Sequence, residues 1–264
     1  MNQRVDVNSS DVGWKSLYRL GGAAALLAGI LFRRNIAAEI GLFAPVPAPD
    51  TVEGWFALLQ SNRLLGLVYL NVFDLLNYVL VAVIFVALYV ALKETNKSYA
   101  AVAAVLGLLG VGVYLASNTA FSMLSLSAQY AAATTEAQRA ALLAAGQALL
   151  AVNRFSDAGS YPGTGGYISL LLVALAGMTA SLVMLRSVVF NRVTAWVGIL
   201  ANGFDLAYCV GFLFVPRVSS ELLAVLFIPA AGLFFMVWHI LVGWRLYRLG
   251  RFSAEYASPL PKYS

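Results

Sequence analysis

The sequence predicts an all-α, polytopic membrane protein built as a bundle of six transmembrane helices. Of its 264 residues, 61% are hydrophobic and only 11% are charged, whereas a soluble domain carries about 25% charged residues. The hydrophobic residues gather in stretches long enough to cross a bilayer. A short phrase also occurs twice, as Asn71–Leu75 and Asn202–Leu206, each time inside one of these stretches.

A membrane domain is expected over residues 17–246, between a polar tail at 1–16 and a second tail at 247–264. Its spans are predicted at 17–43, 63–92, 99–121, 167–185, 193–215 and 222–244. The first span either ends at Phe32, giving ~24 Å of helix, or continues through Arg33 and Arg34 to Phe43, giving ~40 Å. No small-x-small cleavage site follows it, which favours an uncleaved span.

The segments between the spans have distinct characters. Prolines at 45–49 stop the first helix, and Thr51–Phe56 reads as an interfacial helix with Trp55 at the depth of the headgroups. A polar turn at 93–97 separates the second and third spans. Residues 135–152 are rich in alanine and leucine and predict an amphipathic helix outside the membrane or on its surface. A glycine-rich loop at 156–166 leads into the fourth span, and a basic turn at 186–192 follows it.

The distribution of basic residues predicts the orientation. An even number of spans places both termini on one side, and eleven of the 17 lysines and arginines fall on that side: Arg4, Lys15, Arg19, Lys93, Lys97, Arg186, Arg192, Arg245, Arg248, Arg251 and Lys262. Lysine and arginine concentrate in cytoplasmic loops. The protein is therefore expected in the cytoplasmic membrane, with its N- and C-termini in the cytoplasm and the amphipathic helix outside the cell.

The repeated phrase places one aspartate, Asp74 or Asp205, in each of two spans. A carboxylate in hydrocarbon costs a few kcal/mol, so it is expected to face the bundle interior and to find partners there. The second and fifth spans run in opposite directions, as corresponding helices of an inverted three-plus-three repeat do in transporters. The alternative is that five similar residues recur by chance in so apolar a chain.

The polar residues around the aspartates predict a ligand or proton site. In the second span Asn71, Asp74 and Tyr78 share a helical face that Asn77 flanks, and in the fifth span Asn202 and Asp205 cluster likewise. Candidate counter-charges are Arg63, Arg34 and Arg33, the last lying ~21 Å along a continuous first helix from its cytoplasmic end. The alternative is structural, with the aspartates joining helices by hydrogen bonds.

Other kinds of chemistry find little support. The single cysteine, Cys209, excludes an intramolecular disulfide. The single histidine, His239, lies ~9 Å from the cytoplasmic end by helix rise, nearer to it than the aspartates, and is expected to be a packing residue. The Gly163–Gly166 stretch lacks the Lys-Ser/Thr ending of a phosphate loop. We expect no catalytic residue, no metal, no cofactor and no nucleic-acid partner.

Three phrases carry a likeness to known sequences, namely 63–66 with its continuation to Asp74, Leu92–Lys97 and Val193–Leu200. Through them the chain resembles uncharacterised bacterial six-span membrane proteins of a domain-of-unknown-function family. Some members have a histidine before the fourth span, where this chain reads Ser156–Tyr161 without one. The resemblance implies the architecture and no activity. The residues themselves favour a small transporter or a ligand- or proton-binding membrane protein, whose partners are the lipid bilayer and a small ligand. The alternative is a non-catalytic accessory subunit with protein partners, in which the aspartates are structural.

Overall fold

The computed structural model describes residues 14–39, 48–152, 163–214 and 217–255. Within these ranges the side chains of 32–39, 212, 217–226, 228 and 252–255 are outside the description. The elements of the described part are all helices: α1 (Lys15–Glu39), α2 (Val52–Ser61), α3 (Arg63–Tyr69), α4 (Val72–Ser117), α5 (Ala120–Ala132), α6 (Glu136–Val152), α7 (Thr164–Met184), α8 (Arg192–Phe214) and α9 (Arg217–Glu255). The described chain is therefore all-helical, as predicted.

Four helical stretches in the described part are long and apolar enough to cross a membrane. They are Val72–Ala132, Thr164–Met184, Arg192–Gly211 and Pro229–Arg251. The chain is thus a multi-pass membrane protein by length and composition. The first stretch includes α4, whose 46 residues correspond to ~69 Å of helix, more than twice the ~30 Å of a hydrocarbon core.

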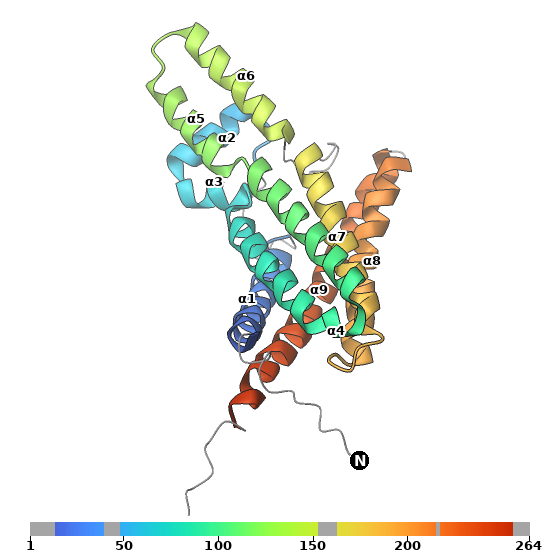
Figure 1. Cartoon of the computed structure of the whole chain (residues 1–264). Coiled ribbons are helices and arrows are strands. Elements are labelled where there is room, and N and C mark those ends of the chain that lie inside the picture. The colour runs from blue at the N-terminus through green and yellow to red at the C-terminus, as the bar shows by residue number, and fades with distance from the viewer. Residues whose placement is uncertain (1–13, 40–47, 153–162, 215–216, 256–264) are drawn as a thin grey trace, which may run out of the picture.

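Helix α4 turns back on itself at Asn96. This residue leaves the helical conformation, with φ −157° and ψ 98°, and its side-chain oxygen accepts a hydrogen bond from the amide of Tyr99 at 3.1 Å, which caps the second half. The rings of Tyr78 and Tyr114 stack at 3.8 Å, and Asn96 lies midway between them in the sequence. The predicted polar turn at 93–97 is therefore the bend of a hairpin, drawn as two neighbouring arms in Figure 1.

The N-terminal part of α1 and the C-terminal part of α9 meet at one end of the bundle, shown at the bottom of Figure 1. Arg19 Nε donates to the carbonyl of Gly250 at 3.0 Å, and the Lys93 ammonium lies 5.1 Å from the centroid of the Trp14 ring. The α7–α8 turn lies at the same end, where Arg245 donates to the carbonyl of Val189. We call this the basic end. Its arginines bind backbone carbonyls, so they tie helix ends together while keeping their charge.

Small residues let the membrane helices pack closely. The main core contains many buried alanines and a few large side chains, among them Ile84, Leu88, Phe235 and Trp238. Interfaces of membrane helices favour small residues because van der Waals contact replaces the hydrophobic effect there. The outer faces instead expose large apolar side chains, such as Leu109 at 55%, which suits contact with lipid.

A second hydrophobic core lies at the opposite end, in a cap formed by α2, α3, α5 and α6 (Figure 1). Phe56 is fully buried there and Trp55 is 5% exposed. Ser127 Oγ donates to the carbonyl of Phe56 at 3.0 Å, which joins α5 to α2. The Trp55 ring packs edge-on against Tyr69, with centroids 6.5 Å apart, so Trp55 is a core residue of this cap, and its position at headgroup depth stays a prediction.

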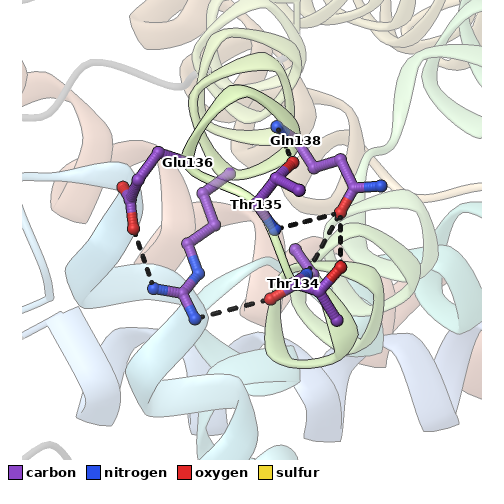
Figure 2. A network of polar contacts seen from close by, with 6 residues as sticks. Thr134, Thr135, Glu136 and Gln138 are labelled. Atoms are coloured by element: carbon purple, nitrogen blue, oxygen red, sulfur yellow. Dashed lines mark hydrogen bonds and ion pairs between the residues drawn. The ribbon is translucent and has the colours of Figure 1, made fainter.

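The turn between α5 and α6 is closed by reciprocal hydrogen bonds (Figure 2). Thr135 Oγ1 accepts from the amide of Gln138 at 3.2 Å, and Gln138 Oε1 accepts from the amide of Thr135 at 3.3 Å. This pattern is a capping box, which satisfies amides that a helix start leaves without partners. Arg139 also pairs with Glu136 at 3.2 Å. Helix α6 therefore begins one residue later than the predicted segment 135–152.

Candidate functional site

A break in the backbone positions the first aspartate. The sequence predicts one helix over 63–92, but the structure interrupts it at Leu70 and Asn71, between α3 and α4. Asn71 adopts the left-handed conformation, with φ 58° and ψ 38°, and no other non-glycine residue of the described part has a positive φ. Asparagine tolerates this conformation better than most residues. Asp74 therefore lies in the first turn of α4, where the helix dipole favours a negative charge.

Replacing Asn71 by valine is expected to lower stability by about 1–2 kcal/mol, since a β-branched residue adopts left-handed φ only with strain. Glycine at the same position relieves the strain and is expected to leave stability unchanged or slightly higher. Thermal unfolding of the two variants in the same detergent measures the difference. Equal midpoints for Asn71→Val and Asn71→Gly would contradict the assignment of strain to this residue.

A pair of stacked tyrosines covers Asp74. The planes of Tyr78 and Tyr114 differ by 6°, so the two halves of α4 touch face to face at this level. The Tyr114 hydroxyl donates to Asp74 Oδ2 at 3.4 Å. That distance exceeds the usual 2.5–3.0 Å of such bonds.

The second aspartate lies on another helix, within electrostatic range of Tyr78. Tyr78 interacts electrostatically with both Asp74 and Asp205, and its hydroxyl faces that of Ser169 on α7. Ser169 Oγ donates to the carbonyl of Gly110 at 2.9 Å, which fixes α7 against the second half of α4. We call Asp74, Tyr78, Tyr114, Ser169 and Asp205 the aspartate seam. It combines residues of three helices, α4, α7 and α8, inside the bundle.

The two copies of the repeated phrase have different local structures. Asn71 lies at the break before α4, whereas Asn202 lies within α8, is fully buried, and donates through Nδ2 to the carbonyl of Gly198 at 2.7 Å. The second copy is thus in a helix as predicted, and the first is at a helix start. Asn77 is also buried, at 5% exposure, and its side-chain oxygen has no partner among the described residues.

The break also changes the expected counter-charges. Arg63 is exposed at the start of α3, on the other side of the break from Asp74, so its role as a counter-charge stays a prediction. The side chains of Arg33 and Arg34 lie outside the described part. A Cβ on Gly21 would touch Ala87, and α1 runs antiparallel to this half of α4. Residue 34 comes as many residues after Gly21 as Asp74 comes before Ala87, so the backbone of residue 34 lies level with Asp74. The pairing of Asp74 with Arg33 or Arg34 stays a prediction.

His239 lies apart from the seam in a tightly packed environment. It is 3% exposed, its Nδ1 is 2.8 Å from the carbonyl oxygen of Phe235, and its ring meets that of Trp238 edge-on at 5.2 Å. Within the described ranges no three histidine, cysteine, aspartate or glutamate residues are grouped as they would be around a metal ion. The seam is therefore an oxygen-rich site with two carboxylates and phenolic and aliphatic hydroxyls.

Reasoning from the sequence missed three members of this region: Tyr114, Ser169 and Tyr167. Tyr167 donates to the carbonyl of Cys209 at 3.0 Å, which joins α7 to α8 just beyond Asp205. Tyr114 could have been found from the sequence, because Tyr78 and Tyr114 are equally distant from the polar turn around Asn96. Ser169 and Tyr167 gave no such signal, since their neighbours depend on which helices pack together.

Comparison with known proteins identifies a family and no activity. A family model described as a domain of unknown function, DUF4386, matches residues 16–243. No curated protein matches the chain. No solved structure matches it either.

Proposed function

This chain belongs to the DUF4386 family of domains of unknown function, and from its own residues we propose that it is a small transporter whose aspartate seam binds and releases protons. The observation that carries the proposal is the convergence of Asp74 and Asp205 on Tyr78. Ionisable residues within membrane helices are rare and mark ion pathways and proton relays. Two carboxylates that share one tyrosine form the simplest such relay.

The partial exposure of the two aspartates favours proton exchange over a purely structural role. Both Asp74 and Asp205 are partly exposed, unlike the fully buried Asn202. The Tyr114 hydroxyl also contacts Asp74 Oδ2 at 3.4 Å, which places a second hydroxyl beside the carboxylate.

The proposed topology has six spans, namely α1, the two halves of α4, α7, α8 and α9, with both termini in the cytoplasm. The basic end supports this orientation, because it gathers Lys93, Arg19 and Arg245. In an inverted three-plus-three repeat, α1 and the two halves of α4 correspond in order to α7, α8 and α9. The packing of α1 against α9 then corresponds to that of α7 against the second half of α4, and both interfaces are extensive. The packing of α1 against the first half of α4 likewise corresponds to that of α7 against α8, and both pairs are in contact.

Proton movement in liposomes tests the proposal. The purified protein is reconstituted with a trapped pH-sensitive dye, and a potassium gradient with valinomycin sets a negative interior. We expect proton uptake that is lost in Asp74→Asn and in Asp205→Asn and kept in Glu136→Gln, which removes an exposed carboxylate of the cap. Wild-type uptake no faster than that of empty liposomes, or equal uptake in all four proteins, would refute the proposal.

An accessory subunit of a larger membrane complex is the second candidate. The observation that favours it is an open, small-residue notch at Gly112, where a Cβ would touch nothing, beside exposed Leu108, Leu109 and Leu115. Helices in membranes associate through such small-residue faces. Purification in mild detergent followed by mass spectrometry distinguishes the candidates: a stoichiometric second protein, retained by Asp74→Asn, supports the subunit, and an isolated chain supports the transporter.

A further inference from the structure

Hydrogen-bonding groups continue from the aspartate seam toward the basic end along one face of α8. One turn below Asp205 lies Asn202, followed at helical spacing by Gly198, Thr194 and Asn191. Asn202 and Thr194 are buried at 0% and 3% exposure, and Thr194 Oγ1 donates to Asn191 Oδ1 at 2.8 Å. Asn191 is exposed in the α7–α8 turn. From Asp205 to Asn191 this face covers ~21 Å of helix.

The middle of this face contains buried polar atoms that lack hydrogen-bond partners within the described structure. They are Asn202 Oδ1 on α8, Ser181 Oγ on α7 and Trp238 Nε1 on α9, and their residues are 0%, 0% and 2% exposed. Leaving such a group without a partner costs about 1–3 kcal/mol. Between them the three atoms offer two acceptors, Asn202 Oδ1 and Ser181 Oγ, and two donors, Ser181 Oγ and Trp238 Nε1.

Two glycines bring these atoms together. A Cβ at Gly198 would lie 2.2 Å from Ser181 Oγ and 2.4 Å from Trp238 Nε1, so these two groups, from different helices, meet over the same residue. A Cβ at Gly177 would lie 2.0 Å from Asn202 Oδ1, one turn nearer the seam. The polar atoms thus converge on one strip of the α7–α8–α9 interface rather than being scattered.

We propose that bound water occupies this strip and connects Asp205 with the basic end. The strip, defined by Asn202, Ser181, Trp238 and Thr194, deepens the proposed function, on which it rests, by giving the seam a route to one side of the membrane. A buried water typically makes about three hydrogen bonds to groups that otherwise lack partners. Trp238 Nε1 donates, Asn202 Oδ1 accepts and Ser181 Oγ does both, which are the roles that water needs. Protons reach Asp205 along the waters, and the side chains only hold the waters in place.

Reaction with silver ions, which enter narrow water-filled passages and bind thiolates, tests for this water. Cys209, the single cysteine, is first changed to alanine, and Ser181→Cys and Ala180→Cys are then made separately. Ala180 is 1% exposed and lies in the apolar core on the adjacent position of α7, so it is a control matched in depth. We expect Ser181→Cys to lose its free thiol to silver while Ala180→Cys keeps its thiol.

Equal reactivity of the two thiols, whether both react or neither does, would overturn the proposal. A second measurement avoids substitution in the strip: with uniform ¹⁵N labelling, the indole proton of Trp238 is expected to exchange with deuterium before the backbone amides of the surrounding turns of α9, and slower exchange counts against the water. Neither assay measures transport. A reactive Ser181→Cys thiol together with absent proton uptake would therefore refute the proposed function and leave the hydrated strip standing.

Discussion

Replacing Phe56 by alanine is expected to destabilise the cap by about 3–5 kcal/mol, the largest single effect predicted for this chain. Phe56 is fully buried and its ring lies 5.3 Å from that of Tyr130, between α2 and α5. The Phe56 ring also packs closely against Gly146 of α6, because a Cβ at Gly146 would lie 3.0 Å from Phe56 Cζ. Truncation therefore removes the side chain that α2, α5 and α6 share.

The measurement is the rate of tryptic cleavage after Arg139 in nanodiscs, because opening of the cap exposes α6 to protease. Phe121→Ala is the matched control: it makes the same chemical change on α5 at a side chain that is 60% exposed, where substitutions typically change stability by no more than about 0.5 kcal/mol. We expect rapid cleavage in Phe56→Ala alone. The same rate in both variants would show that Phe56 does not hold the cap.

Replacing Gly22 by leucine is expected to separate α1 from α9 and to destabilise the bundle by about 3 kcal/mol, the upper end of the range for overpacking. A Cβ at Gly22 would lie 2.6 Å from the backbone nitrogen of Tyr247 and 2.9 Å from the carbonyl oxygen of Gly243. Backbone atoms cannot rotate away as a side chain does. The helices must therefore move apart, which also withdraws Arg19 from the carbonyl of Gly250.

Gly112→Leu is the control for this prediction, because a Cβ at Gly112 would meet nothing within 4 Å. Both variants put the same side chain into a long apolar helix and change the helix propensity by the same amount. We expect a clear fall of the thermal unfolding midpoint in detergent for Gly22→Leu and none for Gly112→Leu. Similar midpoints would mean that α1 and α9 do not meet through their backbones.

Much of the architecture could be predicted because hydrophobicity and length are local properties. The helical class and the fourth and fifth apolar segments follow from runs of apolar residues, and α7 and α8 begin and end within a few residues of the predicted 167–185 and 193–215. The break at Asn71 could not be predicted in this way. Nothing around it interrupts the apolar pattern, and left-handed asparagine depends on how α3 folds onto the cap.

The two charged residues of the candidate site could be predicted from the sequence, but the residues that surround them could not. Asp74 and Asp205 stand out because a carboxylate is rare in an apolar stretch. Their shared electrostatic influence on Tyr78, and the cover from Tyr114, depend on the hairpin at Asn96 and on the position of α7, which periodicity alone does not specify. The position of Arg63 relative to Asp74 could not be predicted for the same reason, because helical counting across 63–74 assumes a straight helix and the chain breaks between α3 and α4.

Labelling with a hydrophobic carbodiimide tests the central claim most directly, that Asp74 and Asp205 form one proton-exchanging seam. The reagent reacts with protonated carboxyl groups in apolar surroundings, and mass spectrometry identifies the labelled residue. The account predicts label on Asp74 or Asp205, at a rate that falls as the pH rises, and a changed rate at the remaining aspartate in Asp74→Asn or Asp205→Asn. Label confined to exposed carboxylates such as Glu136, or a rate at Asp205 that is the same with and without Asp74, would contradict it.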